Sequence, residues 1–197
     1  LGTTGVFVIY DELEGKEPVT WSYLLHTVEL PMEIQELTDE VKVIGKNKAG
    51  GVSVAHLFSS AKTEQAMVDT FFCAPTNWKN VTNAQGKALK YPNHWHFSST
   101  TVPCKTARFL TVMDTHGKNR PDMQVVRKGN TIQVGDWTIT CNLTVKGKGA
   151  IYVSNKTEKV SLNYDADKKE GATIVTDQVK GKQVNKVLTD YLPDFEI

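Results

Sequence analysis

The ten residues Asp136–Val145 read DWTITCNLTV, and polar and apolar side chains alternate along the whole stretch. Successive side chains of a β-strand point to opposite faces, so this alternation gathers the apolar residues on one face. The apolar set is Trp137, Ile139, Cys141, Leu143 and Val145. One buried and one solvated face is typical of a strand in an antiparallel sheet.

Other stretches also predict strands. Gly51–Ser59 repeats the alternation, with Val52, Val54, His56 and Phe58 on one side. Gly5–Tyr10 and Arg108–Met113 are continuous apolar runs, which predicts strands covered on both faces. Trp21–Val28 is a further long run rich in aromatic and apolar residues.

Turn signals divide these runs at short intervals. Lys128–Asn130 and Gly135–Asp136 are expected hairpin turns. Helical periodicity is weak, and only Val184–Tyr191 suggests a short helix. We therefore expect an all-β fold, an antiparallel β-sandwich or large two-layer sheet, over a single domain 1–197. Residues 149–197 either complete this sandwich or pack on it as a peripheral C-terminal extension.

Composition excludes some classes of function. The 197 residues are 40% apolar and 23% charged, with a net charge of +1, so a broad basic surface for nucleic acid is not expected. A small basic groove for an acidic sugar remains compatible with this balance. No apolar run reaches the roughly 18 residues of a membrane span. The first five residues resemble neither an initiator nor a signal peptide, so we expect a piece of a longer protein.

His94-Trp95-His96 is the local motif that most directly suggests a binding site. On a strand, the two imidazoles would project from the same face. They could supply half of a zinc site, but a tetrahedral site needs further ligands that the sequence does not bring near. A hydrogen-bonded structural pair or a polar patch is the commoner role. No cofactor is predicted, and Cys73, Cys104 and Cys141 form no CxxC pair, which leaves their disulfide state open.

Two tryptophans are candidate sugar-stacking platforms. Trp78 lies in the long irregular stretch Cys73–Asn93, and Trp95 follows it. Long loops often carry binding residues, although a buried tryptophan is an equally ordinary reading. Trp78, His94, Trp95 and His96 are therefore the candidate substrate-binding residues.

The sequence predicts no catalytic residue of its own. No serine or cysteine lies in a nucleophile elbow, and no glycine-rich loop fits a phosphate. Asp114 and His116 precede a turn, so we expect them to shape that turn rather than form a catalytic dyad. His56, on an apolar strand face, is expected to be a structural histidine.

Several segments resemble a known family in order and spacing. Val8–Leu13 (VIYDEL) is followed by Glu17-Pro18, by Trp21 and by Leu24–Thr27 (LLHT). These motifs resemble the β-domain of the heparinase II/III-like polysaccharide lyases. Asn93–Phe97 and Ala107–Val112 look like a later pair of strands from the same region, so the resemblance extends to about residue 145.

The resemblance implies a multidomain enzyme that cleaves polysaccharides containing uronic acids by β-elimination. Such an enzyme has an upstream α/α-toroid that carries the catalytic tyrosine, followed by β-sheet domains, and it is secreted or periplasmic in bacteria. The toroid lies outside this chain, and His26 matches a structural position of the LLHT motif. No catalytic residue of the family therefore transfers to this chain.

The leading hypothesis is a non-catalytic C-terminal β-domain that supports an upstream catalytic domain of the same protein and helps to line a cleft for an acidic polysaccharide. Two alternatives remain. The chain could be an independent carbohydrate-binding module, or it could hold a small metal site on His94 and His96.

Overall fold

Strands account for all the regular structure that the computed structural model describes. The described residues are 5–28, 30–69, 84–87, 94–157, 160–165, 173–179 and 182–188. Within these ranges fifteen strands form three antiparallel sheets and no helix occurs, which confirms the all-β prediction. Among these residues no helix is long and apolar enough to cross a membrane.

The central sheet has five strands, in the order β1-β8-β5-β4-β3. Its strands are β1 (Val6–Val19), β8 (Cys104–Gly117), β5 (Gly51–Ser59), β4 (Val41–Lys46) and β3 (Glu33–Glu36). The two longest strands, β1 and β8, pair along most of their length, and β8 also pairs with β5. Strand β8 therefore lies inside the sheet, and β1 lies at its edge.

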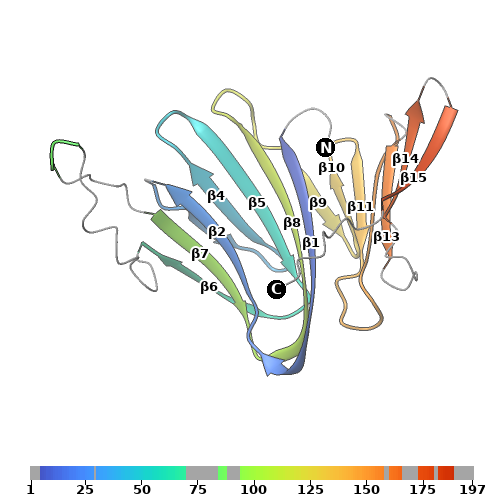
Figure 1. Ribbon diagram of the computed structural model, residues 1–197, viewed down its shortest axis with the longest axis horizontal. Helices are drawn as coiled ribbons and strands as arrows, with labels where there is room; N and C mark the ends of the chain where they lie inside the picture. Colours follow the sequence, from blue (N-terminus) through green and yellow to red (C-terminus); the bar gives the residue numbers. More distant parts are fainter. Residues whose placement is uncertain are drawn as a thin grey trace.

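The second sheet has three strands, in the order β2-β7-β6, and lies to one side of the central strands (Figure 1). They are β2 (Ser22–Val28), β7 (His94–Thr101) and β6 (Thr63–Val68). Chain continuity from β1 to β2 and from β7 to β8 forms a corner between the two sheets. The Trp21 indole N–H fixes this corner by donating to the carbonyl of Cys104 at 3.1 Å.

The third sheet has seven strands, in the order β15-β14-β13-β12-β11-β10-β9, and lies on the other side (Figure 1). Its strands are β9 (Val125–Lys128), β10 (Thr131–Val134), β11 (Trp137–Cys141), β12 (Ala150–Asn155), β13 (Val160–Asp165), β14 (Thr173–Val179) and β15 (Lys182–Leu188). Both predicted hairpin turns are present, and Gly129 and Gly135 adopt the positive φ angles of 61° and 54° that favour glycine.

Two apolar cores separate the three layers. The first core lies between the central and third sheets and includes Phe58, Leu110, Val112, Ile139 and Trp137. The second core lies between the central and second sheets and includes Val43, Leu57, Phe97, Ala107 and Phe109. The β-sandwich prediction is thus confirmed, with a third layer beyond the two that the sequence predicted.

The covered faces of the central strands differ from the sequence prediction in two places. Residues Val54–Phe58 are buried on both faces of β5, although the alternation predicted one apolar face. Conversely, Gly5–Tyr10 was predicted to be covered on both faces, but Phe7 and Ile9 are exposed. The reason is that β1 is an edge strand, and the second sheet does not extend over this end of it. Arg108–Val112 of β8 is buried on both faces, as predicted.

The C-terminal part of the described chain continues the third sheet. Strands β12 to β15 add to β11 one after another through antiparallel pairing. The short helix predicted for Val184–Tyr191 is wrong, because Val184–Leu188 belongs to β15 and pairs with β14; the remaining three residues lie outside the described ranges. Pairing within the β14–β15 hairpin prevails there over a weak helical pattern.

Candidate functional site

The outer face of the second sheet brings together the histidines that the sequence singled out. Along β7, Phe97, Ser99 and Thr101 are buried toward the central sheet. Because side chains alternate on a strand, His94 and His96 project to the opposite, outer face, as the HxH spacing predicted.

A third histidine, His26, joins this pair through strand register. His26 lies directly opposite His96 in the pairing of β2 with β7. The two rings are in edge-to-face contact, with centroids 4.3 Å apart and an interplanar angle of 83°. We call His26, His94 and His96 the histidine cluster. Burial and the nearby His26 and His94 lower the pKa of His96, because each disfavours the imidazolium.

The histidine cluster does not have the form of a metal site. In an edge-to-face pair the edge of one ring meets the face of the other, so their nitrogen lone pairs do not converge on one point. Within the described ranges, no group of three or more His, Cys, Asp and Glu side chains is placed to hold a metal ion. The metal alternative raised for His94 and His96 therefore gains no support from the arrangement of these rings.

The described residues place neither Trp95 nor Trp78 as an exposed platform for a sugar. Trp95 projects to the inner face of β7 and packs, partly buried, against the second core. The expectation of an exposed platform at Trp95 is thus wrong, because a residue between two outward histidines must face inward. Trp78 lies outside the described residues. Trp137 is buried in the first core, as its alternating pattern predicted.

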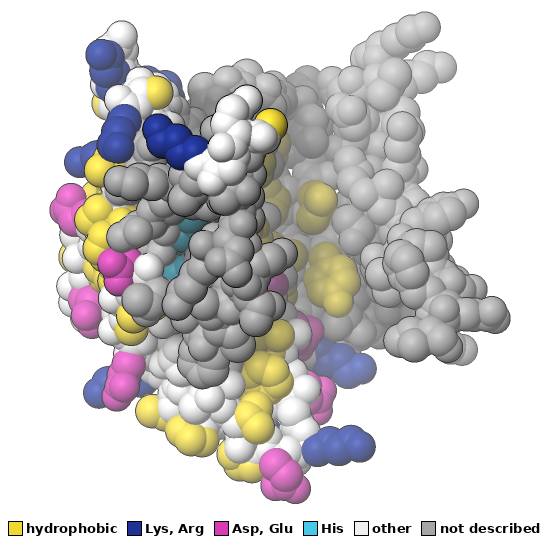
Figure 2. Space-filling view, turned by 60° about the vertical axis from the view of Figure 1, so that its left-hand side comes forward, with side chains coloured by type: hydrophobic (Ala, Val, Ile, Leu, Met, Phe, Trp, Pro, Cys, Tyr) yellow, Lys and Arg dark blue, Asp and Glu magenta, His cyan; other side chains and the backbone are white. Residues whose placement is uncertain are grey.

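The surface around the histidine cluster is partly apolar and partly hydroxylic. Leu24, Val28 and Val68 are 55%, 47% and 47% exposed, so this face is open to solvent. Ser22 and Thr100 hydrogen-bond to each other across the same face at 2.8 Å. Figure 2 shows a small part of the histidine side chains in a recess on this side of the molecule. Such a face can contact a ligand through imidazoles, hydroxyls and aliphatic side chains together.

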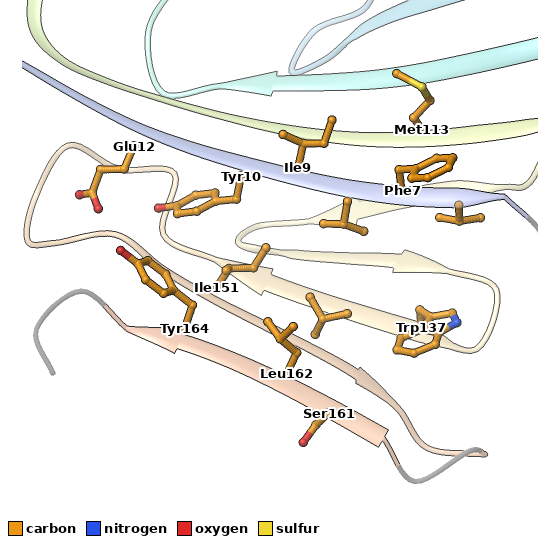
Figure 3. Close-up of a pocket in the computed structure, with 13 residues that line it drawn as sticks. Phe7, Ile9, Tyr10, Glu12, Met113, Trp137, Ile151, Ser161, Leu162 and Tyr164 are labelled. Atoms are coloured by element: carbon orange, nitrogen blue, oxygen red, sulfur yellow. The ribbon is translucent and has the colours of Figure 1, made fainter. Parts of the chain in front are cut away.

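An apolar groove of about 940 Å³ runs along the edge strand β1, opposite strands β11 to β13 (Figure 3). Phe7, Ile9 and Tyr10 line it from β1, and Ile151 and Leu162 line it from the third sheet. The sequence does not predict this groove, because it depends on how two sheets meet. Its lining suits an apolar contact better than an acid–base reaction.

Tyr10, at one end of the groove, has a structural role. Its hydroxyl donates to the backbone carbonyl of Asn142 at 2.7 Å, which ties β1 to the third sheet. Burial raises the pKa of Tyr10 to about 12. A tyrosine that acts as a general base needs a pKa near the working pH, and this shift is in the opposite direction.

An ion pair between the buried Arg108 and the partly exposed Glu12 joins the central sheet to the loop between β11 and β12. Arg108 is in contact with Oε1 of Glu12 at 2.6 Å and donates to the carbonyls of Gly147, at 2.6 Å, and Thr144. The same Glu12 oxygen accepts the backbone N–H of Gly149 at 2.7 Å. These contacts occupy the one charged residue of the groove lining, Glu12, and give it a structural role.

Asp114 and His116 stabilise the segment that leaves β8. Asp114 pairs with Arg120 and accepts the N–H of Met123 at 2.8 Å, while His116 lies 3.2 Å from Asp122. These contacts hold the segment that leaves β8, which agrees with the predicted turn-forming role of Asp114 and His116.

His56 is buried, and its Nδ1 lies 2.7 Å from Oε1 of Glu40. This ion-pairing distance within the fold fits the structural role that the sequence predicted for this histidine.

No protein-family model matches this chain, and a search of curated proteins finds no match to it.

Proposed function

We propose that this chain is a non-catalytic C-terminal β-domain of a heparinase II/III-like polysaccharide lyase. In this proposal an upstream catalytic domain of the same protein is its partner, and the protein is secreted or periplasmic. The outer face of the second sheet contributes to the cleft for a polysaccharide that contains uronic acids.

One observation carries the proposal. Four of the segments on which the family resemblance rests lie on two pairs of neighbouring strands. Val8–Leu13 in β1 pairs with Ala107–Val112 in β8. Leu24–Thr27 in β2 pairs with residues 95–98 of β7, which include most of the HWHF motif. Motifs that are far apart in sequence are thus partners in space, as expected if they form one structural unit.

The chemistry of the described residues supports a non-catalytic role. β-Elimination needs a group that withdraws the proton next to the carboxylate and another that neutralises this carboxylate. Tyr10 and Tyr23 have raised pKa values, mainly because they are buried. The buried Arg108 is held by Glu12 and by backbone carbonyls, so it is committed to the fold.

An activity comparison tests the proposal. The chain alone and the full open reading frame that contains it would be purified and assayed on alginate, polygalacturonate, heparin and chondroitin through the ultraviolet absorbance of the unsaturated product. We expect product from the full protein and none from the chain alone. Cleavage by the isolated chain, or a reading frame without an upstream helical toroid, would contradict the proposal.

The open outer face of the second sheet favours an independent carbohydrate-binding module as a second candidate. Leu24, His26 and Ser22 project from β2 on this side, and no core residue covers them. Affinity electrophoresis distinguishes the two candidates. Migration of the isolated chain through a glycan gel is retarded if the chain is an independent module. It is not retarded if the domain acts only together with its catalytic partner.

A further inference from the structure

The edge strand β1 directs part of its backbone hydrogen-bonding groups away from the central sheet. The carbonyl of Gly5 accepts the N–H of Thr115 directly opposite, so β8 bonds to Gly5 and to every second residue after it. The N–H and C=O groups of the intervening residues, which include Val8 and Tyr10, therefore point outward. Within the described chain no strand pairs with β1 on that side. The outward groups of Val8 and Tyr10 are in position to bond to one further strand.

The features that commonly protect a sheet edge are confined to the other half of β1. Lysine, proline and irregular pairing each hinder the addition of a strand. Within the described residues of β1, Lys16, Pro18 and the register shift between Glu14 and Val19 all lie in the C-terminal half. Pairing with β8 is regular from Val6 to Glu14. The N-terminal half is thus a straight, unprotected edge of the kind that accepts an extended peptide.

The apolar groove has a wall on each side of the position that an added strand would take (Figure 3). Phe7, Ile9 and Met113 line it on the face of the central sheet that carries the second core, and Phe7 and Ile9 are 55% and 40% exposed. Ile151 and Leu162 line it from the third sheet. Successive side chains of an added strand point alternately to the two faces, so each meets an apolar wall. The groove therefore fits a strand with an uninterrupted apolar run.

Asp11 determines the charge expected at one end of this run. It lies on the same face of β1 as Ile9 and is partly buried. Burial raises the pKa of Asp11, and no charged group of the described chain offsets this cost of burial. A lysine or arginine directly opposite Asp11 would supply the missing compensation. In an antiparallel strand this basic residue comes first, and the apolar run opposite Phe7–Tyr10 follows it.

We propose that the free edge of β1 binds an extended segment of a partner protein as an added antiparallel strand, in which a basic residue precedes an apolar run. The segment bonds to the outward backbone groups of Val8 and Tyr10 and places its basic residue beside Asp11. Its apolar side chains fill the groove between β1 and the third sheet. This site lies apart from the histidine cluster and goes beyond a role in polysaccharide cleavage.

A second copy of this chain fits the edge less well than a single strand. Strand β13 contributes to the groove, and β14 and β15 continue the third sheet beyond the edge of β1 (Figure 1). Two-fold pairing of two β1 strands keeps both third sheets on the same side of the joined central sheet. Strands β13 to β15 of the two copies would then occupy the same space. A partner that offers one extended strand avoids this overlap.

The test is fluorescence anisotropy of a labelled peptide, GSKVIVYGS with blocked ends, titrated with the full 197-residue chain. Its lysine is designed to lie opposite Asp11, and its residues VIVY lie opposite Phe7–Tyr10. We expect saturable binding with a Kd below about 1 mM. Replacing the peptide lysine by glutamate should weaken binding about tenfold, because two carboxylates then lie side by side.

N-methylation of the peptide distinguishes strand addition from apolar contact alone. Methyl groups on both valines, which lie opposite Val8 and Tyr10, remove the N–H groups that bond to β1 and should abolish binding. Methyl groups on the lysine and the isoleucine are the matched control. The N–H groups of these residues point away from β1, so this peptide should bind nearly as well as the parent.

Variants of the chain assign the charge preference to Asp11. Asp11→Asn should remove most of the preference for the lysine peptide over the glutamate peptide. Glu14→Gln is the matched control and should preserve it, because Glu14 lies on the other face of β1. Near-ultraviolet circular dichroism checks that both variants are folded, and the methylated peptides test strand addition on the natural chain if either variant is not.

Each contrary result overturns a defined part of the proposal. Absence of binding at about 1 mM chain overturns the site as a whole. Equal effects of the two methylation patterns overturn strand addition, and a lysine preference that persists in Asp11→Asn overturns the charge assignment. A dimer in analytical ultracentrifugation that Val8→Pro dissociates would overturn the partner protein in favour of a second copy, because this proline removes an outward N–H and leaves the bonds to β8 in place.

Discussion

Glu12→Gln tests whether the ion pair with the buried Arg108 holds the third sheet against the central sheet. The Arg108 side chain is 1% exposed and that of Glu12 is 27% exposed, so the arginine cannot recover its lost hydration without moving. Oε1 of Glu12 accepts hydrogen bonds from Arg108 at 2.6 Å and from the N–H of Gly149 at 2.7 Å. Glutamine keeps the shape and a carbonyl oxygen, so the substitution removes the charge alone.

The expected loss follows from these two hydrogen bonds. Bonds to charged groups contribute roughly 1.5–3 kcal/mol each and neutral ones roughly 0.5–1.5, so each bond loses about 1 kcal/mol. The free energy of unfolding should therefore fall by about 2 kcal/mol. The 3–5 kcal/mol typical of a fully buried pair does not apply, because water reaches part of Glu12. For a chain of this size, about 2 kcal/mol lowers Tm by roughly 4–8 °C.

Urea unfolding followed by tryptophan fluorescence measures this loss. Glu14→Gln is the matched control, since Glu14 lies two residues further along the same face of β1, is exposed, and undergoes the same change of charge. We expect the control to change stability by less than about 0.5 kcal/mol. Equal losses in the two variants would refute the argument, because they would show that burial of Arg108 adds nothing to the value of its carboxylate partner.

Two further predictions concern groups whose burial raises their pKa. The pKa of Tyr10 is about 12 in the folded chain against about 10 unfolded, so its contribution to stability is present below pH 10 and lost as the pH rises toward 12. The stability difference between the natural chain and Tyr10→Phe in urea should shrink above pH 10, and a difference independent of pH would contradict this. Burial also raises the pKa of the Cys141 thiol to about 11, so iodoacetamide should alkylate the half-buried Cys104 well before Cys141. Peptide mass mapping measures both rates, and equal rates in the folded chain would show that Cys141 is not protected.

The sequence predicts strands well where neighbouring side chains decide them. The alternation in DWTITC places the buried Trp137, Ile139 and Cys141 on one face of β11. The apolar run Gly5–Tyr10 does not reveal that Phe7 and Ile9 are exposed, since this depends on whether a second sheet extends over that end of β1. Val54–Phe58 has apolar side chains on both faces once Ala55 and Leu57 are counted, and this signal already predicts the doubly covered strand that the structure has.

Part of the candidate site could also be predicted. The HxH spacing places His94 and His96 on one face, and the same parity places Trp95 with Phe97 on the inner face, so the sequence itself argued against an exposed tryptophan there. The place of His26 could not be predicted. It depends on the register between β2 and β7, which the corner at Trp21 sets through hydrogen bonds to residues 101 and 104.

The arrangement of layers separates the residues that hold the sheets together from the residues on the outer face of the second sheet. The two apolar cores and the Arg108–Glu12 pair lie between sheets, where any change of shape or charge disturbs two layers at once. The histidine cluster lies on the far side of the second sheet, where a substitution changes the surface and leaves both cores intact. Substitutions in the cluster should therefore leave the free energy of unfolding nearly constant, and substitutions at Arg108 or Glu12 should lower it. That contrast makes His26→Gln a suitable variant for the affinity electrophoresis, because it changes the outer face and retains the interactions that hold the sheets together.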